Sequence, residues 1–146
     1  MRLITEEALA VATIMQEAEG ETYAGKLGVA EVIRNRMTKR YSSDGTVHGT
    51  VLRYKQFSGW NENTKLMRRS LQIDDENNVV RDCIKAWREA MSGSNTVHGA
   101  VLYYNPDPRL VPETPDWAMP DSAIEVAVIG QHHFFIPKPR PGTVKV

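Results

Sequence analysis

The most extended apolar pattern of the chain lies near its N-terminus. Apolar side chains fill most of residues 8–18 and leave almost no polar face, so a helix with this sequence is expected to be central and buried. Thr5 is a suitable N-cap, and the two glutamates that follow it complement the positive end of the helix dipole. Gly20 disfavours continuation of the helix.

Two more helices are predicted from the spacing of apolar positions. One covers approximately residues 24–39. The other opens near Asp74 or Asp75 and runs to Met91, where apolar side chains recur at helical intervals and Gly93 supplies a stop.

The remaining patterned segments are short. Residues 46–54 and 96–104 have closely similar sequences, and both look extended. They either form similar structural elements that lead into substrate loops or resemble each other by coincidence. Residues 125–129 and 133–136 predict a β-hairpin, and residues 61–71 predict a short helix. The expected class is α+β, mainly helical with a small β element.

Length and composition favour one domain. A chain of 146 residues with 41% hydrophobic content can bury a core, and we place this domain in residues 1–136 with an extended tail in residues 137–146. Cys83 is the only cysteine, which excludes an internal disulfide and fits synthesis in a reducing cytoplasm. The N-terminus lacks the apolar core of a signal peptide, and no segment approaches transmembrane length.

The charge of the chain is balanced, with 18 basic and 18 acidic residues. This balance disfavours nucleic acid as a partner, because no global positive field is available to hold a polyanion. Arg34, Arg36, Lys39 and Arg40 form a local basic stripe, which we interpret as a solvated helix end, with contact to an anionic polymer as the alternative.

The strongest candidate for acid chemistry is Glu17, at the end of the first predicted helix. Burial and the negative end of the helix dipole both disfavour its carboxylate, so we expect a raised pKa, as a general acid near neutrality requires. Glu21 lies four residues later and would share this face if the helix continued, whereas Glu19 would point elsewhere. The alternative is that all three acids form a solvated helix end.

The four histidines are a weak signal for metal chemistry. A zinc peptidase or amidase could recruit His48, His98, His132 and His133, but the sequence contains no helical histidine pair with an adjacent glutamate. We therefore expect no metal and no cofactor.

Six short motifs occur in an order that resembles the SleB-type cell wall hydrolases, which include spore cortex-lytic enzymes and some phage endolysins. They are Glu17-Ala18-Glu19-Gly20-Glu21, the Gly25-Lys26 step into Val29-Ala30 and Asn35-Arg36, Gln56-Phe57-Ser58, Tyr103-Tyr104-Asn105-Pro106, Asp116-Trp117 and Ile129-Gly130-Gln131-His132-His133-Phe134. The resemblance runs through nearly the whole chain except the C-terminal tail.

This resemblance implies a lysozyme-like domain that cuts the glycan strands of peptidoglycan between N-acetylmuramic acid and N-acetylglucosamine. The catalytic glutamate of the family matches Glu17, and its histidine matches His132, while a role for His133 is doubtful. Spore enzymes of this type act as lytic transglycosylases with one acid that also serves as the base. The other motif residues suit sugar binding: Gln56, Tyr103, Tyr104 and Asn105 by hydrogen bonds, and Phe57, Trp60 or Trp117 by stacking.

Two alternatives stay open at this point. A hydrolytic muramidase would use Glu21 as a second carboxylate, and a noncatalytic peptidoglycan-binding module would leave Glu17 unexplained. We expect a monomeric endolysin of a phage that infects a Gram-negative host. It would be made in the host cytoplasm and reach the periplasmic wall when a holin opens the inner membrane.

Overall fold

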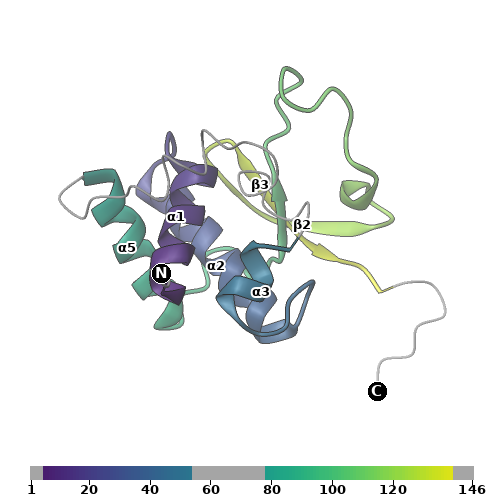
Figure 1. Ribbon diagram of the computed structural model, residues 1–146. Coiled ribbons are helices and arrows are strands. Elements are labelled where there is room, and N and C mark those ends of the chain that lie inside the picture. The colour runs from purple at the N-terminus through teal and green to yellow at the C-terminus, as the bar shows by residue number, and fades with distance from the viewer. Residues whose placement is uncertain (1–4, 54–77, 140–146) are drawn as a thin grey trace.

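The computed structural model describes residues 5–53 and 78–139, which form a mainly helical protein with a small antiparallel sheet (Figure 1). The elements in chain order are α1 (Glu6–Ala18), α2 (Tyr23–Lys39), α3 (Val47–Val51), α5 (Asn78–Met91), β1 (Leu102–Tyr104), the 3₁₀ turn η2 (Asp116–Ala118), β2 (Ala123–Ile129) and β3 (His132–Pro137). The expected α+β class is confirmed. The predicted helix over residues 61–71 and the predicted start of α5 lie outside the described residues.

Helix α1 forms as its sequence predicts. The Thr5 side chain accepts a hydrogen bond from the backbone N–H of Ala8 at 3.1 Å, and Glu6 and Glu7 occupy the first turn. All side chains from Leu9 to Met15 are buried. Ala18, the last residue of the helix, is also buried, and the two polar residues before it, Gln16 and Glu17, are partly buried.

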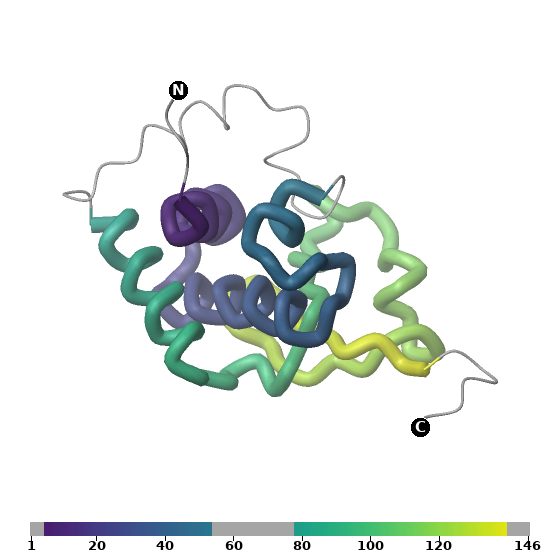
Figure 2. Tube along the Cα trace, turned by 60° about the horizontal axis from the view of Figure 1, so that its bottom comes forward, coloured from purple at the N-terminus to yellow at the C-terminus, as the bar shows by residue number. Residues whose placement is uncertain are grey.

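Helix α2 lies at the centre of the molecule and is flanked by α1, α5 and the sheet (Figure 2). This position corrects the expectation of a solvated basic stripe at its end. Arg36 is only 4% exposed, and its Nε donates to the carbonyl of Val101 at 2.6 Å. Arg34 is half-buried and donates to the carbonyl of Ala90, also at 2.6 Å. Lys39 and Arg40 alone of the stripe are exposed.

The two repeated segments adopt different structures, so the extended prediction is wrong for the first. Thr46 caps α3 by accepting from the backbone N–H of Gly49 at 2.9 Å, which starts a helix. In the second segment the Thr96 hydroxyl instead donates to the distant Glu31. His98 and Gly99 then adopt positive φ angles of 53° and 82°, and the chain continues into strand β1.

Helix α5 packs its apolar stripe against α1 and α2. Trp87 is buried in this core, as is Cys83, whose pKa is raised to about 11 by burial. Met91 departs from the prediction because it is exposed at the end of the stripe. Gly93 ends the helix with a φ of 109°, and its N–H donates to the carbonyl of Ala90.

The three strands form one antiparallel sheet in the order β1-β3-β2. The predicted hairpin is confirmed as β2 and β3. Tyr103 pairs with Phe134 on the face toward the helices, whereas Tyr104 pairs with His133 on the opposite face. The helical face is in close contact with α2, because a Cβ atom at Gly28 would lie 2.8 Å from Phe134 Cζ. Within residues 5–53 and 78–139, the helices are too short or too polar to cross a membrane.

Candidate active site

The C-terminal end of α1 places Glu17 beside Tyr103 of β1 and within electrostatic range of Arg36 of α2. Burial raises the pKa of this carboxyl above its ordinary value. Two neighbours oppose the shift: the Tyr103 hydroxyl and the Arg36 guanidinium both stabilise the ionised form and lower the pKa. Desolvation is the largest of these effects, so the net pKa of Glu17 is raised, as predicted from its position at the end of an apolar helix.

Arg36 is buried, and Tyr103 is partly buried with its hydroxyl shielded from solvent. Burial raises the pKa of the Tyr103 phenol well above its ordinary value, so the group remains a neutral donor. Its Oη approaches Glu17 without full hydrogen-bond geometry and has no other partner among the described side chains. Arg36 is anchored by Val101 and lies 5.9 Å from the centre of the Tyr41 ring.

This arrangement suits one acid that must work in both protonation states. Desolvation favours the protonated form of Glu17, which is the form that can donate a proton. After it donates, the hydroxyl of Tyr103 and the charge of Arg36 are in place to stabilise the carboxylate. The same group is then available as a base.

Glu21 lies in the turn between α1 and α2, not on a continued helix. Its backbone N–H donates to the carbonyl of Ala18 at 3.0 Å, and its side chain is 16% exposed. Gly25 and Gly130 enclose this side chain: an added Cβ would lie 2.8 Å from Glu21 Cβ at Gly25 and 2.6 Å from Oε2 at Gly130. The Oε1 atom lies 3.7 Å from His132 Nδ1.

His132 connects this acid to the Glu17 site. Its ring centre is 5.1 Å from that of Tyr103 in an edge-on arrangement. Burial lowers the pKa of His132, and the nearby Glu21 partly opposes that shift. The imidazole is therefore neutral near pH 7, and its Nδ1 has no hydrogen-bond partner in the described parts of the chain.

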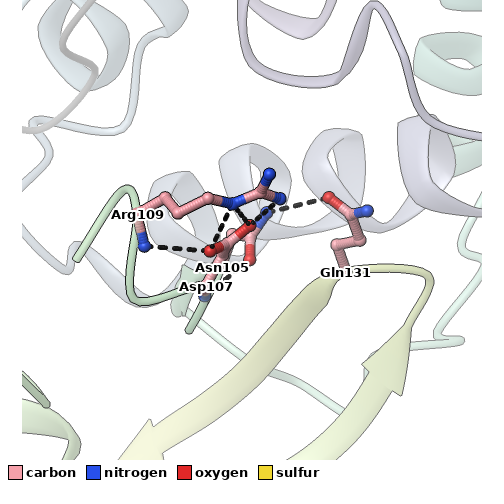
Figure 3. Close-up of polar contacts among 4 residues, drawn as sticks. All are labelled: Asn105, Asp107, Arg109 and Gln131. Carbon is pink, nitrogen blue, oxygen red and sulfur yellow. Dashed lines mark hydrogen bonds and ion pairs between the residues drawn. The ribbon is translucent and has the colours of Figure 1, made fainter. Parts of the chain in front are cut away.

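Asn105 follows β1 and contacts the tip of the hairpin (Figure 3). Its Nδ2 donates to Gln131 Oε1 at 3.0 Å, while its Oδ1 accepts from the backbone N–H of Asp107. Asp107 is in turn paired with Arg109 at 2.6 Å. These contacts order the loop that follows β1.

Two of the other predicted sugar-binding residues, Tyr104 and Trp117, are not gathered with Glu17. Tyr104 and Trp117 pack edge-on against each other on the far face of the sheet, with ring centres 5.5 Å apart. Gln56, Phe57 and Trp60 lie outside the described residues.

The described histidines do not form a metal centre. No group of three or more histidine, cysteine or acidic side chains in residues 5–53 and 78–139 is placed to hold a metal ion. His48 and His98 are exposed, and His133 pairs with Glu125 at 2.5 Å.

Two charged residues of α2, Arg36 and Glu31, are buried, and the sequence pattern did not predict their burial. Arg36 was assigned to a solvated stripe, although it also belongs to one of the six motifs. Glu31 is completely buried and accepts hydrogen bonds from Ser94, Thr96 and the backbone N–H of Val97. A lone acid within the apolar run of residues 29–33 was the available signal for this role.

A mainly helical domain with a buried acid at a helix end beside a small antiparallel sheet is the arrangement of lysozyme-like glycosidases. Residues 20–135 match the Cell Wall Hydrolase family, and the chain belongs to this family. It is therefore an enzyme that degrades peptidoglycan. Glu21 lies within the matched segment, and Glu17 lies three residues before it.

Two solved structures are similar over most of their length. The catalytic domain of the germination-specific lytic transglycosylase SleB from Bacillus anthracis has a TM-score of 0.67 and 26% identity, over 90% of this chain and 93% of that one. The catalytic domain of the Bacillus cereus SleB protein has a TM-score of 0.69 and 27% identity, over 90% of this chain and 89% of that one. No curated protein shows significant similarity to the chain. The structural matches confirm the lysozyme-like fold.

Proposed function

We propose that the chain cleaves the β-1,4 bond between N-acetylmuramic acid and N-acetylglucosamine as a lytic transglycosylase, with Glu17 as the only acid and base. The observation that carries this proposal is the surroundings of Glu17, which favour the protonated acid by burial and stabilise its anion through Tyr103 and Arg36. The similarity to a lytic transglycosylase of Bacillus anthracis supports it.

In this mechanism the Glu17 carboxyl donates its proton to the glycosidic oxygen as the bond from that oxygen to the muramic acid C1 breaks. N-acetylglucosamine leaves with the donated proton on its 4-hydroxyl. The Glu17 carboxylate then takes the proton of the muramic acid 6-hydroxyl while that oxygen bonds to C1. The product ends in 1,6-anhydro-muramic acid, no water is consumed, and Glu17 regains its proton.

A hydrolytic muramidase is the alternative, because Glu21 is a second acid near the same site. A hydrolytic glycosidase uses its second carboxylate as a nucleophile or to activate water. The two oxygens of Glu21 instead face Gly130 and His132. This placement favours a positioning role over direct attack.

The test is mass spectrometry of fragments released from purified Gram-negative peptidoglycan, with Glu17→Gln as the control. We expect wild-type fragments that end in anhydro-muramic acid, each lighter by one water than a hydrolysed fragment, and none from the Gln variant. Hydrated reducing ends would instead indicate a muramidase. Absence of all fragments with the wild type, despite retained binding, would indicate a peptidoglycan-binding module.

We also propose that the enzyme lyses a phage host from within, acting on the periplasmic wall after a holin opens the inner membrane. A chain with one buried cysteine needs no disulfide and is compatible with folding in the cytoplasm. Expression in a Gram-negative cytoplasm should leave cells intact until a holin is co-expressed. Lysis without the holin would contradict this setting.

A further inference from the structure

The residue immediately before Glu17 carries a buried polar group that the fold does not use. Both polar atoms of the Gln16 carboxamide, Oε1 and Nε2, are shielded from solvent and have no hydrogen-bond partner among residues 5–53 and 78–139. An amide that gives up its bonds to water without replacing them destabilises the folded state. The position needs an explanation, because a Met side chain has nearly the same shape and similar helix propensity.

The location of the other unpaired polar groups supplies an explanation for Gln16. Within the described ranges, the buried side-chain atoms without a partner belong to Gln16, Tyr103 and His132 alone. Tyr103 acts on Glu17, and His132 packs against Tyr103. Unsatisfied polar atoms therefore occur at the acid site and at the residue beside it in α1. Binding sites commonly contain such groups, because the ligand supplies the missing partners.

The chemistry of a carboxamide indicates which part of the glycan it would bind. It offers one acceptor oxygen and an NH₂ donor on the same planar group. The acetamido group of an N-acetylated sugar presents the complementary N–H and C=O. A carboxylate offers acceptors only, so it has no donor for the Gln16 oxygen, whereas an acetamido group has both a donor and an acceptor.

We propose that Gln16 is a specificity-determining residue that binds the acetamido group of a sugar next to the cleaved bond. This inference rests on the proposed glycan cleavage and deepens it. Its consequence is a trade-off: the carboxamide destabilises the free enzyme and contributes to substrate recognition when the strand is bound.

The test compares wild type with Gln16→Met on three substrates: native peptidoglycan strands, the same strands after de-N-acetylation, and those strands chemically re-N-acetylated. We expect the variant to lose about tenfold in kcat/KM on native and re-acetylated strands, the value of one polar contact. On de-N-acetylated strands the wild type and the variant should be equally slow. The thermal midpoint of Gln16→Met should rise, because no internal hydrogen bond is lost.

Three results would overturn the inference. They are an unchanged kcat/KM on native strands, an equal loss on all three substrates, and a lower thermal midpoint, which would mean that the amide is paired within the fold. Failure of the proposed glycan cleavage has a different signature, because the wild type itself would then release no glycan fragments from native strands.

Discussion

Glu21 Oε1 lies 3.7 Å from His132 Nδ1, which joins the turn after α1 to the hairpin at the other end of the described chain. Gly25 and Gly130 enclose the Glu21 side chain, and a Cβ atom at either position would collide with it. His132 then contacts the Tyr103 ring, and Tyr103 acts on Glu17. Glu21 is therefore linked to Glu17 indirectly, through the rings of His132 and Tyr103.

Glu21→Gln should therefore retain most of the activity. The amide keeps the shape that fits against Gly25 and Gly130 and removes only the charge beside His132. We expect a loss of less than about tenfold in kcat/KM, against about 10³-fold or more for Glu17→Gln, since the general acid has no substitute. Kinetics on purified strands will measure both. Equal inactivity of the two variants would identify Glu21 as a second catalytic carboxylate.

Tyr103→Phe should change the pH profile as well as the rate. The hydroxyl lowers the pKa of Glu17, so its removal raises that pKa further and moves the alkaline limb of kcat/KM to higher pH. The loss of one donor to the developing carboxylate should reduce kcat by about 10²-fold. Tyr104→Phe is the matched control, because Tyr104 lies on the opposite face of the sheet. An unchanged pH profile of kcat/KM would show that the Tyr103 hydroxyl does not lower the pKa of Glu17.

Glu17→Gln should stabilise the protein at neutral pH while it abolishes activity. In the unfolded chain Glu17 titrates near 4.5, and in the folded protein its pKa is higher. The folded state thus binds the proton more tightly, and its stability falls as pH rises from 4.5 through the folded pKa. Gln carries no such penalty.

Urea unfolding at several pH values will measure this effect. The free energy of unfolding of Glu17→Gln should exceed that of wild type above the folded pKa, and the two should converge below pH 4.5. Glu113→Gln, in an exposed loop, is the control and should change little. A constant difference between Glu17→Gln and wild type at all pH values would argue against a raised pKa.

Local signals were sufficient to predict α1 and the desolvation of Glu17. The Thr5 cap and the apolar run act within the helix itself, and burial of its end follows from the same pattern. The β2–β3 hairpin could also be predicted from the sequence, because its two strands are adjacent in the chain.

Long-range contacts explain what the sequence could not show. The repeated Thr-Val-His-Gly segments diverge because Thr46 bonds to its own Gly49, whereas Thr96 donates to Glu31 far away in the chain. Arg36 was assigned to solvent for the same reason. Its acceptor, the carbonyl of Val101, is separated from it by 65 positions, and no window along α2 contains it.

The contact between α2 and the sheet makes a final prediction about Gly28. Replacement of a helix-interior glycine by alanine usually stabilises a helix by about 1 kcal/mol. At Gly28, however, the new Cβ would lie 2.8 Å from Phe134 Cζ and 3.3 Å from Val97 Cγ1, both in fully buried side chains. We expect Gly28→Ala to lower the free energy of unfolding by about 1–3 kcal/mol through overpacking.

Gly20→Ala is the matched control, because its Cβ would meet nothing within 4 Å. It should leave the free energy of unfolding unchanged or slightly raised, and both variants can be compared by urea unfolding. Phe134 also packs on Tyr103, with ring centres 5.7 Å apart, so a displaced Phe134 should reduce kcat in Gly28→Ala and not in Gly20→Ala. Equal stability of the two variants would mean that the sheet can move away from α2, and that the position of Tyr103 beside Glu17 does not depend on this contact.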